Sequence, residues 1–374
     1  MISLFFAVSL FLSPVLESAT AARASFEDSH GKLPWFTGSL DEAITRAQLE
    51  KKLIFVDFWT TWCTWCKKID RETYSDDSVL AATKDIVCIN VDAESKLGAP
   101  FTERYKPTGF PTMVVLESDG RLRERLTGYL TPVQFKAHLA RILAMPSLDE
   151  LTAQVAADAA NVELRWQLAT RLSAAEDTTI AESHVAEIKR LDPDGKSKAM
   201  HFIALQGVME RVQKLWEQRK EAQTPGLLQA FVATETFPEV QFRAWNVLGQ
   251  IYGVLARQAS DPAEAGRHNA AARNAQVTAW HTAPDSEALA FGKQVLREFE
   301  ANKNKLSADD ELFALEVAGR IETLGAADSE ALDLVACAKF MNGKKDEALA
   351  HLRRAIEIDP IYADPVRHLK EFGG

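Results

Sequence analysis

The residues most able to do chemistry are two cysteines in a Cys-Thr-Trp-Cys motif at positions 63–66, where a helical stretch begins. Cysteines three residues apart at a helix start share one face of its first turn, close enough to form a disulfide without moving the backbone. At the helix N-terminus, free N–H groups and the helix dipole lower a thiol pKa from about 8.5 to roughly 3.5–7.5. The pattern predicts a redox pair in which Cys63 is the attacking nucleophile and Cys66 the shielded, resolving thiol.

Two other interpretations of this pair stay open. A zinc site needs two more ligands, but Cys88 and Cys337 supply no second Cys-x-x-Cys motif and the eight histidines show no ligand-like spacing near the pair. A permanently closed structural disulfide would suit an exported chain, although so short a loop gains little from cross-linking. We interpret Cys88 and Cys337 as core thiols. We expect no metal and no organic cofactor, because thiol–disulfide exchange needs neither.

The elements that would position the pair alternate between buried strands and helices. Strands are expected at residues 53–59, 86–91, 112–116 and 122–127, and helices at about 39–51, 63–80, 100–105 and 131–144. This order predicts a small α/β domain with a central mixed sheet. From Pro146 onward the chain is rich in Ala, Leu, Glu and Arg, and we expect only helices there.

The C-terminal half carries signs of a helical repeat. Trp245, Leu248, Gly249 and Tyr252 fit the W-x-x-L-G-x-x-Y signature of a first repeat helix, and second-helix positions are matched by Gly343, Ala348, Leu352, Ala355 and Pro360. The region therefore resembles degenerate tetratricopeptide (TPR) hairpins. Because the spacing of the loop prolines is irregular, an irregular helical bundle is the alternative.

The segment around the cysteines resembles a thioredoxin-family domain over residues 55–139. Val56-Asp57-Phe58-Trp59 before Trp62-Cys63-x-x-Cys66-Lys67 is similar to the family's buried-Asp strand and active-site helix. Residues 109–112, Gly-Phe-Pro-Thr, are similar to its cis-proline loop, and Gly128 to the glycine after the last strand. The stretch 72–79 most resembles the C-terminal domain of DsbD-type thiol:disulfide interchange proteins.

The resemblance implies roles for several residues. Pro111, if cis, would stand across from Cys63 and leave the Phe110 backbone free to pair with a substrate strand. Asp57, buried beneath the pair, would take or deliver the proton when Cys66 attacks. Trp62 and Trp65, which flank Cys63, would offer partner proteins an apolar docking surface.

The sequence departs from the family at two points. Many thioredoxins carry Gly-Pro between the cysteines, whereas this chain carries Thr64-Trp65, so the redox potential cannot be inherited from the family. Thioredoxins also commonly place a lysine on the strand near the buried aspartate, but residues 53–59 offer only apolar side chains around Asp57. Asp57 is therefore expected to lack its usual cationic partner.

Charge and the first residues bear on partners and location. The 374 residues carry a net charge of −10, of which residues 146–374 account for −9, and this argues against nucleic-acid binding. Residues 2–16 are apolar but too short and broken to span a bilayer, and small residues follow them. We expect a signal peptide at 1–21 cleaved near Ala21 or Ala24, with an uncleaved membrane anchor as the alternative. The mature chain is expected to contain no membrane span and to be periplasmic.

The expected organisation is a signal peptide (1–21), an N-terminal segment (22–38), a thioredoxin-like domain (39–145) and an α-helical TPR-like domain (146–374). The leading hypothesis is an exported thiol:disulfide oxidoreductase that reduces or exchanges disulfides in partner proteins and is itself served by an upstream thiol protein. The helical repeats would bind a partner protein or peptide. The rival hypothesis is a non-enzymatic interaction protein with a redox-inactive thioredoxin-like module.

Overall fold

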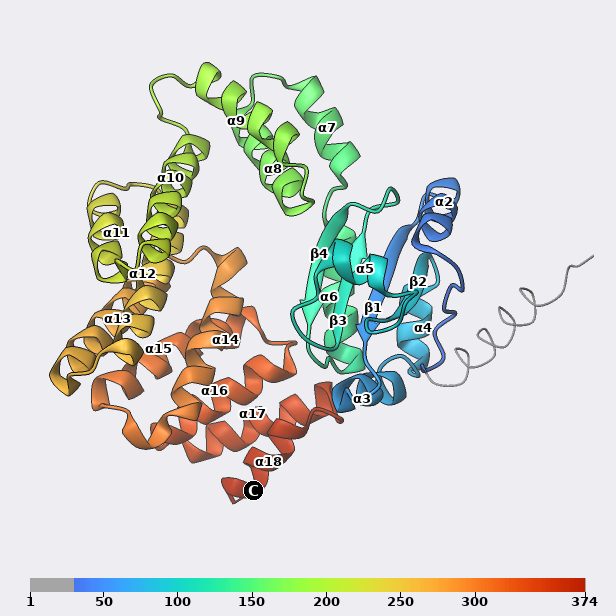
Figure 1. Ribbon diagram of the computed structural model, residues 1–374. Helices are drawn as coiled ribbons and strands as arrows, with labels where there is room; N and C mark the ends of the chain where they lie inside the picture. Colours follow the sequence, from blue (N-terminus) through green and yellow to red (C-terminus); the bar gives the residue numbers. More distant parts are fainter. Residues whose placement is uncertain (1–29, 374) are drawn as a thin grey trace, which may run out of the picture. The chain divides into compact units, whose positions relative to one another are not determined.

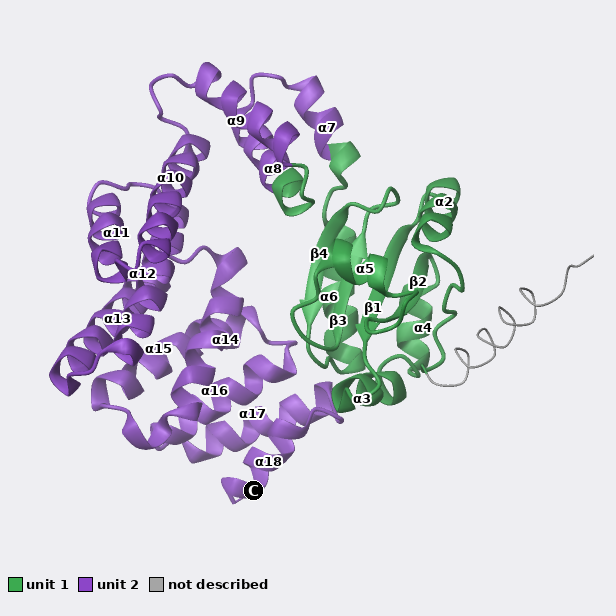
Figure 2. Cartoon of the chain, viewed as in Figure 1, with its two compact units in different colours: residues 1–150, 171–177 green, residues 151–170, 178–374 purple. Residues whose placement is uncertain are grey.

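The chain divides into two compact units (Figure 2). The computed structural model describes residues 30–373, so the expected signal peptide at 1–21 lies outside the described residues, as do residues 22–29 of the expected N-terminal segment. The first unit comprises residues 1–150 and 171–177, and the second comprises residues 151–170 and 178–374. A short stretch, Arg171–Asp177, thus belongs to the first unit although the chain has by then entered the second.

The first unit is built on a mixed sheet, as predicted (Figure 1). Its four strands among the described residues are β1 (Leu53–Trp59), β2 (Ile86–Asp92), β3 (Thr112–Leu116) and β4 (Leu122–Thr127), in the spatial order β2-β1-β3-β4. Strand β1 pairs in parallel with β2 and antiparallel with β3, which pairs antiparallel with β4. Strand β1 is therefore central, which explains its nearly continuous apolar sequence.

Helices cover both faces of this sheet. They are α2 (Leu40–Glu50), α3 (Thr64–Glu72), α4 (Asp77–Thr83), α5 (Ala99–Tyr105) and α6 (Pro132–Ala144). Because successive strand residues point to opposite faces, Ile54, Val56 and Phe58 of β1 pack with residues of α2 and α5. On the other face Phe55 packs with Ile69 of α3 and Phe135 of α6. Asp57 has the same parity as Phe55 and so belongs to the face covered by α3, α4 and α6.

The predicted single helix over residues 63–80 is wrong, because the structure has two helices there. Helix α3 ends at Glu72, and the backbone N–H groups of Thr73 and Tyr74 both donate to the Ile69 carbonyl, which closes the last turn. Asp76 then caps α4, since its Oδ1 accepts from the backbone N–H groups of Ser78 and Val79. The interruption carries the Tyr74 side chain into the core beneath β1.

A buried ionic cluster around Glu117 connects β4 with the end of α6 in the first unit. The guanidinium of Arg123 donates to both carboxylate oxygens of Glu117, at 3.1 and 3.0 Å, and both side chains are buried. Arg123 also donates to the carbonyls of Ile142 and Met145 at the end of α6. Arg171 adds a second guanidinium to Glu117, at 3.1 Å. This cluster explains why Arg171–Asp177 belongs to the first unit.

The region after Pro146 is helical, as predicted, with no strand within residues 146–373. Its α-helices are α7 (Leu148–Ala157), α8 (Val162–Ala174), α9 (Thr178–Leu191), α10 (Lys198–Glu217), α11 (Thr224–Val232), α12 (Pro238–Gln258), α13 (Pro262–Thr282), α14 (Asp285–Ala301), α15 (Ala308–Leu324), α16 (Ser329–Met341), α17 (Lys345–Ile358) and α18 (Ala363–Glu371). Two single 3-10 turns, η1 (Glu221–Gln223) and η2 (Lys303–Lys305), separate some of them. Among residues 30–373, no helix has both the length and the apolar character that a bilayer crossing requires.

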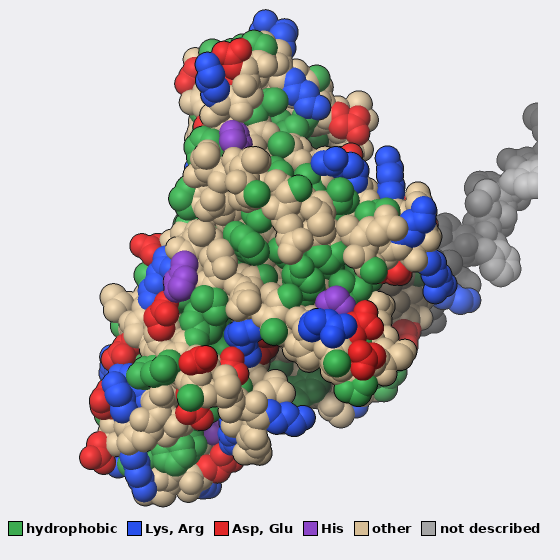
Figure 3. Space-filling view, turned by 90° about the vertical axis from the view of Figure 1, so that its left-hand side faces the viewer, with side chains coloured by type: hydrophobic (Ala, Val, Ile, Leu, Met, Phe, Trp, Pro, Cys, Tyr) green, Lys and Arg blue, Asp and Glu red, His purple; other side chains and the backbone are tan. Residues whose placement is uncertain are grey.

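Consecutive helices of the second unit pack in pairs, notably α12 with α13, α14 with α15, and α16 with α17. The repeat signature lies on α12, where Leu248 is buried and Gly249 lies against the Ala272 carbonyl of α13, so that a Cβ there would sit 3.5 Å from it. On the face shown in Figure 3, acidic and basic side chains are interspersed, so the net negative charge of this half forms no single patch there.

Candidate redox site

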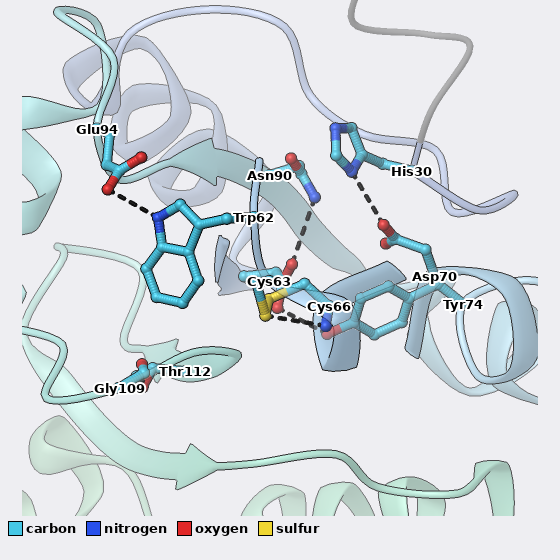
Figure 4. The surroundings of a disulfide bond; sticks show 11 residues. His30, Trp62, Cys63, Cys66, Asp70, Tyr74, Asn90, Glu94, Gly109 and Thr112 are labelled. Carbon is cyan, nitrogen blue, oxygen red and sulfur yellow. Dashed lines mark hydrogen bonds and ion pairs between the residues drawn. A yellow bond between two sulfur atoms is a disulfide. The ribbon is translucent and has the colours of Figure 1, made fainter. Parts of the chain in front are cut away.

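The two cysteines of the motif lie at the start of α3 and are joined by a disulfide (Figure 4). The S–S distance is 2.06 Å and the two Cα atoms are 5.3 Å apart. Cys63 is the N-cap residue of α3, and its Sγ accepts a hydrogen bond of 3.0 Å from the Cys66 backbone N–H. In the reduced protein this N–H would point at the Cys63 thiolate, which is the stabilisation expected at a helix N-terminus. Only 4% of Cys63 and 1% of Cys66 is exposed.

Asp57 is fully buried on β1 and has two polar partners. The Tyr74 hydroxyl donates to its Oδ1 at 2.9 Å, and the Asn90 side-chain amide of β2 donates to its Oδ2 at 3.4 Å. Loss of hydration, reinforced by the negative charge of Asp70, raises the pKa of Asp57 to about 8, whereas the Tyr74 hydrogen bond lowers it. Asp57 thus contacts the Tyr74 hydroxyl and the Asn90 amide, and not the lysine that thioredoxins commonly place near this aspartate.

A second buried pair, His30 and Asp70, lies near this network (Figure 4). Nδ1 of His30 is 3.1 Å from Oδ2 of Asp70 on α3, and both side chains are buried. The His30 ring also packs against the Trp59 ring, with centroids 4.1 Å apart. The segment that precedes α2 therefore reaches back to α3.

The loop before β3 completes the surroundings of the disulfide. The Phe110–Pro111 peptide bond is cis, which was the condition attached to the role of Pro111. The loop is held by the Thr112 hydroxyl, which donates to the Gly109 carbonyl, and by the Gly128 N–H, which donates to the Pro111 carbonyl at 2.9 Å. Gly128 has a φ of +91°, a conformation that disfavours other residues and accounts for glycine at this position.

Two tryptophans stand at the surface on either side of Cys63. Trp62 is 63% exposed, contacts the Phe110 ring edge-on at 5.9 Å, and donates from its indole N–H to Glu94 at 3.0 Å. Trp65 is 56% exposed and lies 5.8 Å from the Tyr129 ring. Two large apolar side chains are therefore held in place beside the disulfide while most of their surface stays in water.

Comparison with known proteins fits this geometry. Residues 40–143 match the family description "Thioredoxin-like domain". These residues form a thioredoxin-like domain. The chain is also 23% identical over 144 residues to the thiol:disulfide interchange protein DsbD of Colwellia psychrerythraea (strain 34H), a match that covers 37% of this chain and 24% of that protein. The chain thus spans about a quarter of the length of this curated relative.

Solved structures similar to the thioredoxin-like domain include a thioredoxin from Thermus thermophilus, at 24% identity, a TM-score of 0.28, and coverage of 30% of this chain and 88% of that one. The oxidised C-terminal domain of DsbD from Neisseria meningitidis is 25% identical, with a TM-score of 0.26, and the match covers 29% of this chain and 97% of that one. The chain is also similar to the TPR protein YrrB, at 12% identity, with a TM-score of 0.30 and coverage of 60% of this chain and 100% of that one.

The site of the thioredoxin-like domain includes residues that the sequence analysis missed. Tyr74 and Asn90, which hold the Asp57 carboxylate, are not among the residues that the sequence predicts. Tyr74 was assigned to the middle of a helix, and no periodic pattern connects it with Asp57, 17 residues earlier. Asn90 offered the better signal, because it is a lone amide within an apolar strand, paired in register with Asp57.

Cys88 is separate from the redox pair. It lies buried on β2, where loss of hydration raises the pKa of its thiol to about 12. Such a thiol has almost no thiolate at neutral pH and is a poor nucleophile. This agrees with its interpretation as a core residue.

Proposed function

We propose that this chain is an exported thiol:disulfide oxidoreductase that reduces or exchanges disulfides in partner proteins. The observation that carries the proposal is the Cys63–Cys66 disulfide at the first turn of α3 in a thioredoxin-like domain. A closed pair at this position can accept two electrons and two protons from one protein and pass them to another. The direction of net transfer depends on the potentials of the partners.

In the reducing direction, the Cys63 thiolate attacks one sulfur of a partner's disulfide. A mixed disulfide forms, and the partner's other sulfur leaves as a thiolate that takes up a proton. The Cys66 thiol then loses its proton and attacks Cys63 Sγ, which releases the second partner sulfur. The partner is now a dithiol and the Cys63–Cys66 pair is a disulfide, which an upstream thiol protein must reduce again.

Asp57 is proposed as the group that takes the proton of Cys66. Its pKa of about 8 leaves it partly ionised near neutral pH, so it can both accept and return a proton. The Tyr74 hydrogen bond stabilises the ionised form and limits how far burial raises this pKa. Tyr74 therefore serves as a positioning residue for Asp57.

The partner is proposed to dock on Trp62, Trp65, Phe110 and Pro111. The edge-on contact of Trp62 with Phe110 links the active-site helix to the cis-proline loop. The exposed faces of Trp62 and Trp65 supply apolar area of the kind that dominates protein-binding energetics. The backbone of Phe110 is proposed to pair with an extended partner segment.

The helical unit is proposed as a scaffold that binds the partner. A hollow of about 870 Å³ lies among α12 to α15, and its lining includes the side-chain amides of Asn246, Gln250, Gln276 and Gln294. Each amide offers both a donor and an acceptor, which suits the backbone of an extended peptide. Replacing Asn246 and Gln250 together by Ala should weaken partner binding without changing the reduction of a small disulfide.

Insulin reduction by dithiothreitol tests the redox assignment. Replacing Cys63 by Ser should abolish the catalysed rate, and replacing Cys66 by Ser should leave partners attached to Cys63 as mixed disulfides. Cys88→Ala is the matched control and should retain full activity. If the Cys63→Ser variant catalyses insulin reduction at the native rate, the oxidoreductase function is excluded. The chain would then be an interaction protein with a redox-inactive module.

We propose export because residues 2–16 are apolar and small residues follow them, as in a signal peptide. Sequencing the N-terminus of protein recovered from the periplasm should find cleavage after Ala21 or Ala24. Recovery of the uncleaved chain from the membrane fraction would favour the anchor instead.

A further inference from the structure

A second group of reactive side chains lies on α16 and α18 of the second unit. Asp333 and Cys337 are four residues apart on α16 and so share one face, which packs against His368 of α18. All three are buried, with 2%, 4% and 2% of their surfaces exposed. Cys337 was interpreted from the sequence as a core thiol, and no sequence pattern pointed to His368.

The three side chains meet at the His368 ring, where Sγ of Cys337 is also 3.8 Å from Nε2. Nδ1 of His368 is 2.8 Å from Oδ1 of Asp333 and 3.4 Å from Sγ of Cys337. One ligand atom from each residue lies within 4.8 Å of the other two. Around a tetrahedral zinc ion, bonds of about 2.0 to 2.3 Å place the donor atoms roughly 3.3 to 3.6 Å apart. The Cys337–His368 separation lies in this range, whereas Asp333 and His368 are closer together and would have to move apart to admit an ion.

The opposite nitrogen of His368 has its own carboxylate. Its Nε2 is 3.3 Å from Oε1 of Glu300, at the end of α14. A carboxylate that accepts the second ring N–H of a histidine fixes the tautomer in which the other nitrogen is free to bind a metal, an arrangement found around most metal-binding histidines. With Nε2–H donated to Glu300, an ion that displaces the proton shared by Nδ1 and Asp333 would find the Nδ1 lone pair facing that carboxylate.

A catalytic role for the Cys337 thiol fits the geometry less well. Both nitrogens of His368 face carboxylates, Asp333 at Nδ1 and Glu300 at Nε2, so neither is left to take the thiol proton. Burial together with the negative charges of Asp333 and Glu300 raises the pKa of the thiol. A positive ion among these groups would reverse that effect, because a coordinated thiol is deprotonated.

The cluster is also accessible. A cavity of about 330 Å³ is lined by Cys337 and His368 together with Glu300, Lys303, Asn304 and Phe372. An ion can therefore reach the ligands, and a water molecule can fill a fourth position on the cavity side.

We propose that Asp333, Cys337 and His368 bind a divalent transition-metal ion, zinc above all, with Glu300 as the group that orients His368. A thiolate and an imidazole favour zinc or cobalt over magnesium or calcium. Binding releases the Cys337 thiol proton and any proton on Nδ1, so affinity should rise with pH. The ion would join α16 to α18 and would keep Cys337 out of thiol–disulfide exchange.

Cobalt binding to the full chain tests the site. The Cys63→Ser/Cys66→Ser background removes the single Cys-x-x-Cys pair of the sequence. Titration with Co²⁺ should then give a thiolate-to-cobalt charge-transfer band that saturates at one ion per chain and is displaced by Zn²⁺. Adding Cys337→Ser should abolish the band, and adding Glu300→Gln should weaken binding by about 10- to 100-fold. Adding Cys88→Ser, the matched change at the other buried free thiol, should leave the band intact.

A Co²⁺ titration without that band, or a band that survives Cys337→Ser, would overturn the proposal. Thermal unfolding measurements check that each variant is still folded. Zn²⁺ should raise the melting temperature of the background protein and of the Cys88→Ser control, and no rise in either would also overturn the site. Because the background lacks the redox cysteines, these outcomes do not depend on the proposed oxidoreductase activity.

Discussion

The Tyr74 hydroxyl donates a 2.9 Å hydrogen bond to Oδ1 of Asp57, and both side chains are buried beneath the central strand. The contact joins the turn between α3 and α4 to the carboxylate that we propose as the proton acceptor of Cys66. It stabilises the charged form of Asp57 against the desolvation that favours the neutral form.

Replacing Tyr74 by Phe should therefore raise the pKa of Asp57 further. A hydrogen bond to a charged group contributes about 1.5 to 3 kcal/mol, so the pH dependence of mixed-disulfide resolution should move up by about one to two pH units. Stopped-flow measurement of that step across pH 6 to 10 checks the shift. Tyr105→Phe is the matched control, because the Tyr105 hydroxyl donates to the Gly120 carbonyl and does not contact Asp57. An unchanged profile in Tyr74→Phe would contradict the proposed coupling.

Asp57 should also make stability depend on pH. Its folded pKa of about 8 lies above the unfolded value near 4, so the folded state binds the extra proton. The stabilisation is complete below about pH 4 and is lost as pH rises toward 8, at up to about 1.4 kcal/mol per pH unit. Urea unfolding of the oxidised protein at pH 5 and pH 8 should show this loss, and Asp57→Asn should remove it. An equal pH dependence in the two proteins would exclude this assignment.

Trp62 should matter for protein partners and not for the chemistry itself. Trp62→Ala removes exposed apolar surface and the contact with Phe110, so kcat/KM for a protein disulfide should fall by about tenfold, equivalent to ~1.4 kcal/mol. The rate of Cys63–Cys66 reduction by dithiothreitol should stay within about twofold. Leu49→Ala, which removes an exposed apolar side chain from α2, is the control and should change neither rate. Equal losses in both rates would point to damage at the cysteines.

Glu117 should be the most sensitive residue of the buried ionic cluster. Glu117→Ala leaves the buried Arg123 guanidinium without its carboxylate, which typically costs about 3 to 5 kcal/mol. Arg171→Ala should cost less, because Glu117 keeps Arg123. Arg141→Ala, which breaks an exposed pair with Glu124, should cost no more than about 1 kcal/mol. Urea unfolding of the full chain should give this order, and similar losses in all three would refute it.

Cys88 should be inert. Its buried thiol, with a pKa of about 12, should resist iodoacetamide in the native protein at pH 8 and react only after unfolding. Mass spectrometry of the alkylated peptides measures this directly. Alkylation of Cys88 at a rate close to that of reduced Cys63 would show that β2 opens far more readily than its burial implies.

Local patterns predicted the parts of the site that lie close together in the sequence. The Cys63–Cys66 spacing and the apolar run of β1 each reflect a single element, and the structure has both as expected. The strand positions were also correct, because alternation and continuous apolar runs report burial on one or both faces.

Contacts between distant residues were not predictable in the same way. Asp57 meets Tyr74 only because the chain breaks its helix at Thr73, and that break depends on Asp76 capping a second helix. His368 reaches Cys337 across 31 residues through the packing of α18 on α16. Such contacts follow from tertiary packing, which no spacing rule in a single sequence records.

The return of Arg171–Asp177 to the first unit limits how this protein can be rearranged in evolution. A single recombination breakpoint near Met145 would join a foreign helical half to a thioredoxin-like half that lacks the Arg171 contact to Glu117. An exchange of intact modules must instead carry this short stretch along with residues 1–150. Because residues 151–170 belong to the second unit, no single breakpoint separates the two units intact, and residues 151–177 must be inherited together with both of them.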